Sequence, residues 1–174
     1  MSALRTLPFA ALAVLLSACG FHPLYGDSGP NGGTREKFTK IFVEPIPDSL
    51  GYELRNTLID IFDSSGRASG AAYRLRVTLG EKTEGVAVQN DEAITRYNDT
   101  LSVNYQLSDG ATGAVLAHGV ETGLSAYNVV TSPYATLAAQ RDADKRAAED
   151  IAYRIRTDLA VYFARGAQPA VTAK

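Results

Sequence analysis

Apolar and polar residues alternate along two stretches in the middle of the chain. Residues 73–79 read Tyr-Arg-Leu-Arg-Val-Thr-Leu, and residues 101–107 read Leu-Ser-Val-Asn-Tyr-Gln-Leu. A period of two predicts a β-strand that buries one face and exposes the other. Turn-forming residues at 90–92 and 108–113 predict hairpin ends on either side of the second strand. We therefore expect these two strands to pair.

Two further strands are predicted with weaker patterns. Residues 38–44, Phe-Thr-Lys-Ile-Phe-Val-Glu, form a short β-rich run that Pro45 closes. Residues 115–126 form the fourth strand, in which Gly119 and Gly123 dilute the apolar pattern. Glycines inside a strand are typical of a bulge, so we expect one there.

A first helix is predicted after Pro47. Asp48 or Ser49 can cap its N-terminus, and Gly66 follows its last apolar position. The apolar residues recur at helical spacing, so they form one stripe: Leu50, Leu54, Leu58, Ile61 and Phe62.

A second, longer helix is predicted to begin at Ser132-Pro133 and to run to Arg165, before Gly166. Serine at the cap and proline at the first helical position are typical of a helix start. Its second half carries a clear apolar stripe that includes Ile151, Ile155 and Leu159. Its first half is polar on nearly all sides, so it is either solvated or in contact with a polar partner.

The order strand, helix, three strands, helix predicts an α+β fold. We expect a two-layer sandwich of two helices packed on one face of a four-stranded, mostly antiparallel sheet, within one domain at residues 37–166. Residues 167–174 are predicted to be a flexible tail. The opposite sheet face is polar and consists of Arg74, Arg76, Thr78, Ser102, Asn104 and Gln106. It is either ordinary solvated surface or a contact face for a polar partner or an anionic ligand.

The N-terminus has the organisation of a secretory signal peptide at residues 1–18. Arg5 supplies a positive charge, an apolar run follows at residues 7–16, and the small residues Ser17 and Ala18 end it. The run is too short to span a membrane comfortably. The alternative, a buried N-terminal helix, has no solvent-facing side.

The single cysteine of the chain follows directly. Leu-Ser-Ala-Cys, ending at Cys19, matches a bacterial lipobox, in which the cysteine thiolate is alkylated with diacylglycerol and the new N-terminus is acylated. The alternatives are a buried thiol or a disulfide, and an intramolecular disulfide needs a second cysteine. Gly20 and Phe21 after the cysteine favour the outer membrane. Residues 19–36 are turn-rich and are predicted to be a lipidated tether.

Composition and the absence of known motifs exclude several classes of function. With 174 residues and a formal net charge of −2, the chain is an ordinary globular protein and not a strongly basic nucleic-acid binder. It contains no nucleotide-binding loop, nucleophile elbow or metal-ligand spacing, so neither an enzyme nor a metal site is predicted. His22 and His118 lack readable catalytic partners, and carboxylates such as Glu81 are interpreted as solvated surface.

Three segments together resemble one protein family. They are LSACGFHPLYG at residues 16–26, TRYNDTLSVNYQLSDGATGAVL from Thr95, and SAYNVVTSPYATLAAQRDADKRAAEDIAYRI from Ser125. The chain is similar over nearly its whole length to the alphaproteobacterial form of LptE, the lipopolysaccharide-assembly lipoprotein family. The resemblance implies two helices on a four-stranded sheet, with no cofactor beyond the lipid on Cys19.

The same resemblance implies partners. They are a β-barrel translocon of the LptD type, which such a lipoprotein plugs and helps to assemble in a one-to-one complex, and lipopolysaccharide, delivered to the cell surface. Candidate contacts for its phosphates are the cationic side chains Arg74, Arg76, Lys82 and Arg96. The alternative is a periplasmic lipoprotein accessory to a lipid-transporting ATPase complex. A membrane-tethered hydrolase is a third class, and no residues support it.

Overall fold

The computed structural model describes residues 33–88 and 94–165 of the chain. The predicted signal peptide, Cys19, most of the predicted tether, the turn at residues 90–92 and the predicted tail lie outside the described residues. The elements, in chain order, are α2 (Thr34–Thr39), β1 (Ile41–Val43), α3 (Ser49–Phe62), β2 (Tyr73–Val88), β3 (Ile94–Asp109), β4 (Val115–Asn128) and α4 (Pro133–Ala164).

The four strands form one open mixed sheet in the order β1-β2-β3-β4. β2, β3 and β4 are long and antiparallel, with Val77 opposite Tyr105 and Val103 opposite Glu121. β1 pairs in parallel with the start of β2, Ile41 lying opposite Tyr73. The α+β prediction is confirmed. Because a parallel pair needs a crossover connection, α3 lies between β1 and β2 in the chain.

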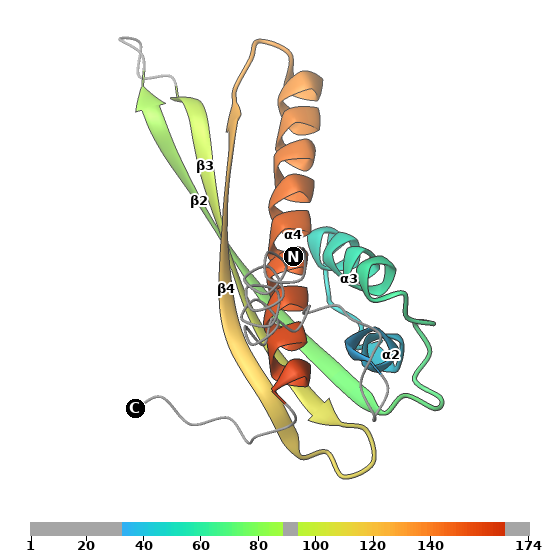
Figure 1. The fold of residues 1–174 in the computed structure, drawn as a ribbon. Helices are drawn as coiled ribbons and strands as arrows, with labels where there is room; N and C mark the ends of the chain where they lie inside the picture. The colour runs from blue at the N-terminus through green and yellow to red at the C-terminus, as the bar shows by residue number, and fades with distance from the viewer. Residues whose placement is uncertain (1–32, 89–93, 166–174) are drawn as a thin grey trace, which may run out of the picture.

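The helices pack on one face of this sheet (Figure 1). α4 has 32 residues and so is about 48 Å long, and it runs along the three long strands. The core between the layers is made of side chains from the odd-numbered strand positions and the helix stripes, including Leu58, Leu75, Val103, Ile155 and Leu159. Among the described residues, no helix is long and apolar enough to cross a membrane.

Two helix boundaries test the predicted capping. Ser132 caps α4, since its Oγ accepts a hydrogen bond from the Ala135 N–H at 3.4 Å, as predicted. α3 follows Asp48, whose side chain makes no capping hydrogen bond. α3 ends at Phe62 rather than near Gly66, because Asp63 adopts the left-handed conformation there.

The predicted first strand is wrong at its start. Residues 34–39 form the short helix α2, so only residues 41–43 remain extended, and the tether predicted to reach Glu36 overlaps this helix. Burial of Phe38 overrides its β-propensity: its ring stacks on Phe62 at 5.0 Å and meets the edge of Phe163 at 5.6 Å. The fold therefore has three helices in the described residues, not two.

The bulge predicted at Gly119 and Gly123 is also wrong. Pairing of β3 with β4 continues without a shift past both glycines, and the register changes between Leu107 and Ser108 instead. The glycines leave room for inward side chains. A Cβ at Gly119 would lie 2.5 Å from the Tyr105 hydroxyl oxygen, and one at Gly123 would lie 2.7 Å from Ile151 Cδ1.

Candidate functional site

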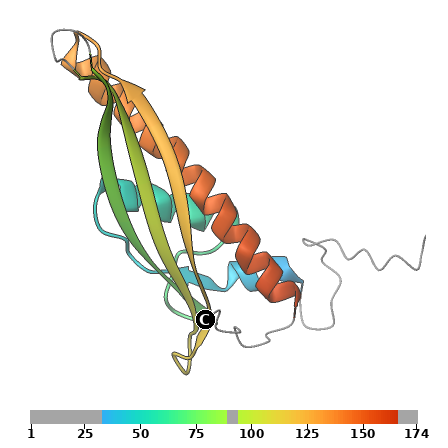
Figure 2. The same ribbon diagram turned by 90° about the vertical axis from the view of Figure 1, so that its left-hand side faces the viewer.

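The face of the sheet opposite the helices is the first candidate site, and we call it the outer face. It is made of the even-numbered positions of β2, β3 and β4, and Figure 2 shows that no helix of the described residues crosses it. The predicted polar residues occupy it: Arg74, Arg76, Thr78, Ser102 and Asn104 are exposed and Gln106 is half-buried. An antiparallel sheet can keep such a face in contact with water or with another molecule.

Two arginines stand side by side at one end of the outer face. The Arg74 guanidinium lies 5.8 Å from the centre of the Phe42 ring, on the neighbouring strand. Arg76 Nε donates to Glu44 Oε2 at 2.9 Å, and this bond raises the pKa of Arg76. Both remain cationic with exposed donors, so this end of the face can accept an anionic group.

The other two predicted cations lie elsewhere on the outer face. Lys82 is paired with Glu84 at 2.7 Å, and the pair raises the pKa of Lys82. Arg96 pairs in register with Ala87, thirteen residues along β2 from Arg74, which is about 40 Å at the usual strand rise. The structure therefore brings Arg74 and Arg76 together but does not gather all four cations into one site.

The fourth strand adds exposed apolar residues to the outer face, which the alternating pattern of β2 and β3 does not predict. Val120 and Leu124 are 64% and 72% exposed. Val120 lies opposite Asn104 and Leu124 opposite Thr100. A shallow hollow of about 250 Å³ between these strands includes Arg76, Thr78, Gln106 and His118 in its lining. The outer face is thus polar on β2 and β3 with exposed apolar positions along β4.

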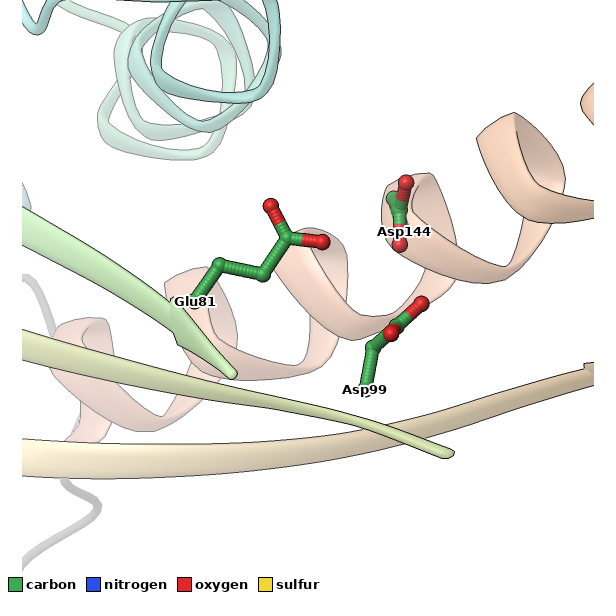
Figure 3. A group of neighbouring side chains, drawn as sticks. All are labelled: Glu81, Asp99 and Asp144. Carbon is green, nitrogen blue, oxygen red and sulfur yellow. The ribbon is translucent and has the colours of Figure 1, made fainter. Parts of the chain in front are cut away.

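A second cluster lies on the helix side of the sheet. Glu81 of β2, Asp99 of β3 and Asp144 of α4 turn their carboxyl groups into one space between the layers (Figure 3). One carboxylate oxygen from each lies within 4.8 Å of the others. The side chain of Asp99 is fully buried, and neither of its oxygens has a hydrogen-bond partner. We call these three residues the acidic cluster.

Burial and the close approach of these carboxyl groups raise the pKa values of two of them. Burial first, and then the charges of Glu81 and Asp99, raise the pKa of Asp144 to about 6. Burial and the charge of Asp99 raise the pKa of Glu81 as well. Ionisation here is costly because buried like charges repel each other in a medium of low dielectric constant. The raised pKa values mean that these carboxyl groups destabilise one another when ionised, so a nearby cation would favour their ionised forms.

The acidic cluster was not predicted from the sequence. Glu81 was interpreted as solvated surface; its side chain is exposed, but it faces the helix layer, unlike Glu84. The signal that was available is Asp99, which occupies an inward position in the alternating strand that continues through Leu101 and Val103. Asp144 lies in the polar first half of α4, so that half is only partly solvated.

Comparison with known proteins identifies the family. The family model described as LptE, lipopolysaccharide-assembly, matches residues 38–159, which is most of the chain. The chain belongs to the LptE family. The match runs from Phe38 at the end of α2 to Leu159 of α4, so it includes both the outer face and the acidic cluster.

Relatives of this LptE-family chain match most of its length. An uncharacterized protein of Rickettsia prowazekii is 26% identical, over 88% of this chain and 94% of its own length. The crystal structure of a candidate lipoprotein from Caulobacter crescentus is 28% identical and superposes with a TM-score of 0.63, covering 75% of this chain and 96% of that one. Rare lipoprotein B of Shewanella oneidensis, 11% identical with a TM-score of 0.53 over 72% of this chain and 96% of its own, shares the fold.

Proposed function

We propose that this LptE-family chain is an outer-membrane lipoprotein that plugs an LptD-type β-barrel and helps to assemble it for lipopolysaccharide transport to the cell surface. The family is one of lipopolysaccharide assembly, which sets the general function. The proposal adds the partner, the one-to-one complex, the location and a role without catalysis. The uncovered outer face is the observation that carries it.

The outer face suits the interior of a large barrel. The lumen of an outer-membrane barrel is polar whereas its lipid-facing side is apolar, and the two kinds of side chain alternate along each strand. A plug must therefore present polar surface on the face that meets the wall. Arg74, Thr78, Ser102 and Asn104 supply such groups on a sheet face that no helix of the described residues covers.

The shape of the protein supports the same role. The long strands and α4 make a narrow body along one axis (Figures 1 and 2). The length of α4, about 48 Å, exceeds the apolar band of an outer-membrane barrel, which is about 25 Å tall. A body of this length can lie along a barrel axis and still project toward the periplasm.

A lipid anchor at Cys19 is part of the proposed function. The lipobox predicts a cysteine with a diacylglycerol and an acyl chain, and two or more chains anchor a protein stably where a single chain does not. The solved structures similar to this chain include a candidate lipoprotein of Caulobacter crescentus and a minor lipoprotein of Acinetobacter baumannii, which supports an anchor of this kind.

Lipopolysaccharide is the proposed ligand of the arginine pair. Its phosphates fit the forked donors of guanidinium groups, and Arg74 and Arg76 are two residues apart on the same exposed face. The exposed apolar residues Val120 and Leu124 lie on the same face and can contact acyl chains or an apolar part of the barrel wall.

Charge reversal of the arginine pair tests this surface. The variant Arg74→Glu/Arg76→Glu is expected to weaken binding to lipopolysaccharide or to the barrel at least tenfold, because four units of charge change beside an anionic or polar partner. Arg76 also loses its ion pair with Glu44, so thermal unfolding must first show that the variant is folded. Binding is measured by immobilising the variant on a surface and titrating it with purified lipopolysaccharide and, separately, with the purified barrel.

The matched control is Arg35→Glu/Arg67→Glu, which changes the net charge equally. Arg35 lies on α2 and Arg67 follows α3, so both are away from the outer face, and both are exposed. Unchanged affinity of the Arg74→Glu/Arg76→Glu variant for both partners would reduce the outer face to solvated surface.

A further inference from the structure

The acidic cluster lies at a junction of three elements that are far apart in the sequence. β2 contributes Glu81, β3 contributes Asp99 and α4 contributes Asp144. Figure 3 shows their carboxyl groups converging between the strands and the helix. A surface cluster of acids would diverge into water, whereas this cluster has one member, Asp99, that is 0% exposed. A buried carboxyl group of this kind either is protonated or is balanced by a nearby cation.

Buried oxygens without partners concentrate at the same place. Both carboxylate oxygens of Asp99 and one of Asp144 are buried and make no hydrogen bond. Ser125 lies directly opposite Asp99 in the β3–β4 register, and its buried hydroxyl oxygen has no hydrogen-bond partner either. Buried polar atoms are nearly always hydrogen-bonded, and exceptions need an explanation such as an ion.

Protein cations do not balance this charge. In residues 33–88 and 94–165, none of the three carboxylates forms an ion pair with a lysine, arginine or histidine. Lys82 follows Glu81 but is paired with Glu84, and Lys145 follows Asp144 but lies 4.0 Å from Glu149. Breaking or omitting the partner of a buried charge is strongly destabilising.

A route from solvent reaches the cluster. Glu81 and Asp144 line an open cavity of about 660 Å³ between the start of α3, β2 and the first half of α4. This cavity is wide enough to admit a hydrated ion and to hold water next to it. The oxygens of the buried Asp99 are therefore close to a passage that an ion and its water ligands can use.

We propose that Glu81, Asp99 and Asp144 bind a calcium ion. Oxygen atoms are the ligands that Ca²⁺ takes, at about 2.4 Å, so oxygens up to about 4.8 Å apart can surround it. One oxygen from each carboxylate satisfies that limit. Ser125 can add a fourth oxygen and water in the cavity can supply the rest. Mg²⁺ fits less well, because it requires shorter bonds of about 2.1 Å in a regular octahedron.

Such an ion would hold α4 to the sheet next to the start of α3. β2, β3 and α4 meet there through carboxyl groups that otherwise repel one another. Because the ion binds only the folded arrangement, it stabilises the protein by mass action. This inference does not depend on the identity of the partner barrel.

The test uses the full lipoprotein in nonionic detergent, stripped of metal with chelator and then dialysed. Calcium chloride is titrated by calorimetry, and thermal unfolding is followed with calcium chloride, magnesium chloride, and sodium chloride of equal ionic strength. At a calcium concentration about 100 times the dissociation constant, we expect the Tm to rise by about 5–10 °C. Sodium chloride is expected to leave it nearly unchanged.

Two variants assign the effect to the cluster. Asp99→Asn and Glu81→Gln keep the side-chain shape and are expected to lower calcium affinity at least tenfold. The matched controls are Asp150→Asn, an exposed position of α4, and Glu84→Gln, an exposed position of β2, both expected to retain the wild-type rise. The proposal is overturned if calcium does not raise the Tm of the wild-type protein or if both cluster variants keep the full rise. An equal rise with magnesium would overturn the choice of calcium.

Discussion

Replacement of Ile151 by alanine is expected to lower the free energy of unfolding by about 2–5 kcal/mol. Ile151 is fully buried on α4 and fills the space that Gly123 leaves on β4. Its loss leaves a cavity between the two layers along the contact that holds the long helix to the sheet. Chemical denaturation followed by circular dichroism measures the change. A loss below about 1 kcal/mol would contradict the packing described here.

The glycine opposite Ile151 provides a compensating test. In the Gly123→Ala variant, the new methyl carbon would lie 2.7 Å from Ile151 Cδ1, so we expect overpacking to cost about 1–3 kcal/mol. Ile151→Val removes that Cδ1 atom, and the double variant should therefore lose less than the two single variants together. The control is Gly80→Ala, whose methyl carbon would approach only the Ser102 carbonyl oxygen, at 3.9 Å. Additive losses would contradict a direct contact.

The Cys19→Ala variant is expected to lose its lipid entirely, and the protein made in excess over the barrel is expected to leave the membrane. The chain has one cysteine, so this substitution removes the proposed acyl anchor and no other thiol. Loss of two or more acyl chains removes far more apolar binding energy than the exposed surface of a small domain can replace. Fatty-acid labelling and membrane fractionation measure the two consequences.

A serine in the predicted tether supplies the control for that experiment. Ser28→Ala changes one small residue near the same end of the chain and is expected to be lipidated and fractionated as the wild-type protein is. Fatty-acid labelling of the Cys19→Ala variant, or its normal membrane fractionation in the absence of the barrel, would contradict the lipobox interpretation.

The strands and the long helix could be predicted because burial leaves a simple pattern in the sequence. Leu75 and Val103 are buried while Arg76 and Asn104 are exposed, so alternation predicted both the strands and their two faces. Ser132 and Pro133 gave the start of α4 because capping depends on local residues. The helix start depends on neighbouring residues, and each strand repeats its pattern every two residues, so both can be predicted from the sequence.

The errors arise where distant contacts override local preference. Phe38 has a strand-forming aromatic ring, yet contact with Phe62 and Phe163 places it in a helix. The strand pattern predicts a bulge at Gly119 and Gly123, whereas these glycines accommodate side chains from β3 and α4. No local pattern contains this information, because the partners are separated along the chain.

The two candidate sites differ in how far the sequence predicts them. The arginine pair of the outer face follows from alternation within β2 alone. The acidic cluster needs the register of β2 with β3 and the position of α4, although Asp99 at an inward position was a visible anomaly. A polar residue on the buried face of a strand is thus the signal that sequence analysis can use.

The most direct test of the proposed function is affinity purification of the tagged full chain from detergent-extracted outer membranes, followed by mass spectrometry and quantitation of the co-eluting proteins. The proposal predicts that one large β-barrel protein co-elutes in a ratio near one to one. Because the outer face is proposed to meet the barrel wall, the Arg74→Glu/Arg76→Glu variant is expected to recover much less of this barrel. Recovery of a transporter subunit instead, or of no barrel, would contradict the plug role and favour an accessory lipoprotein of a lipid-transporting ATPase.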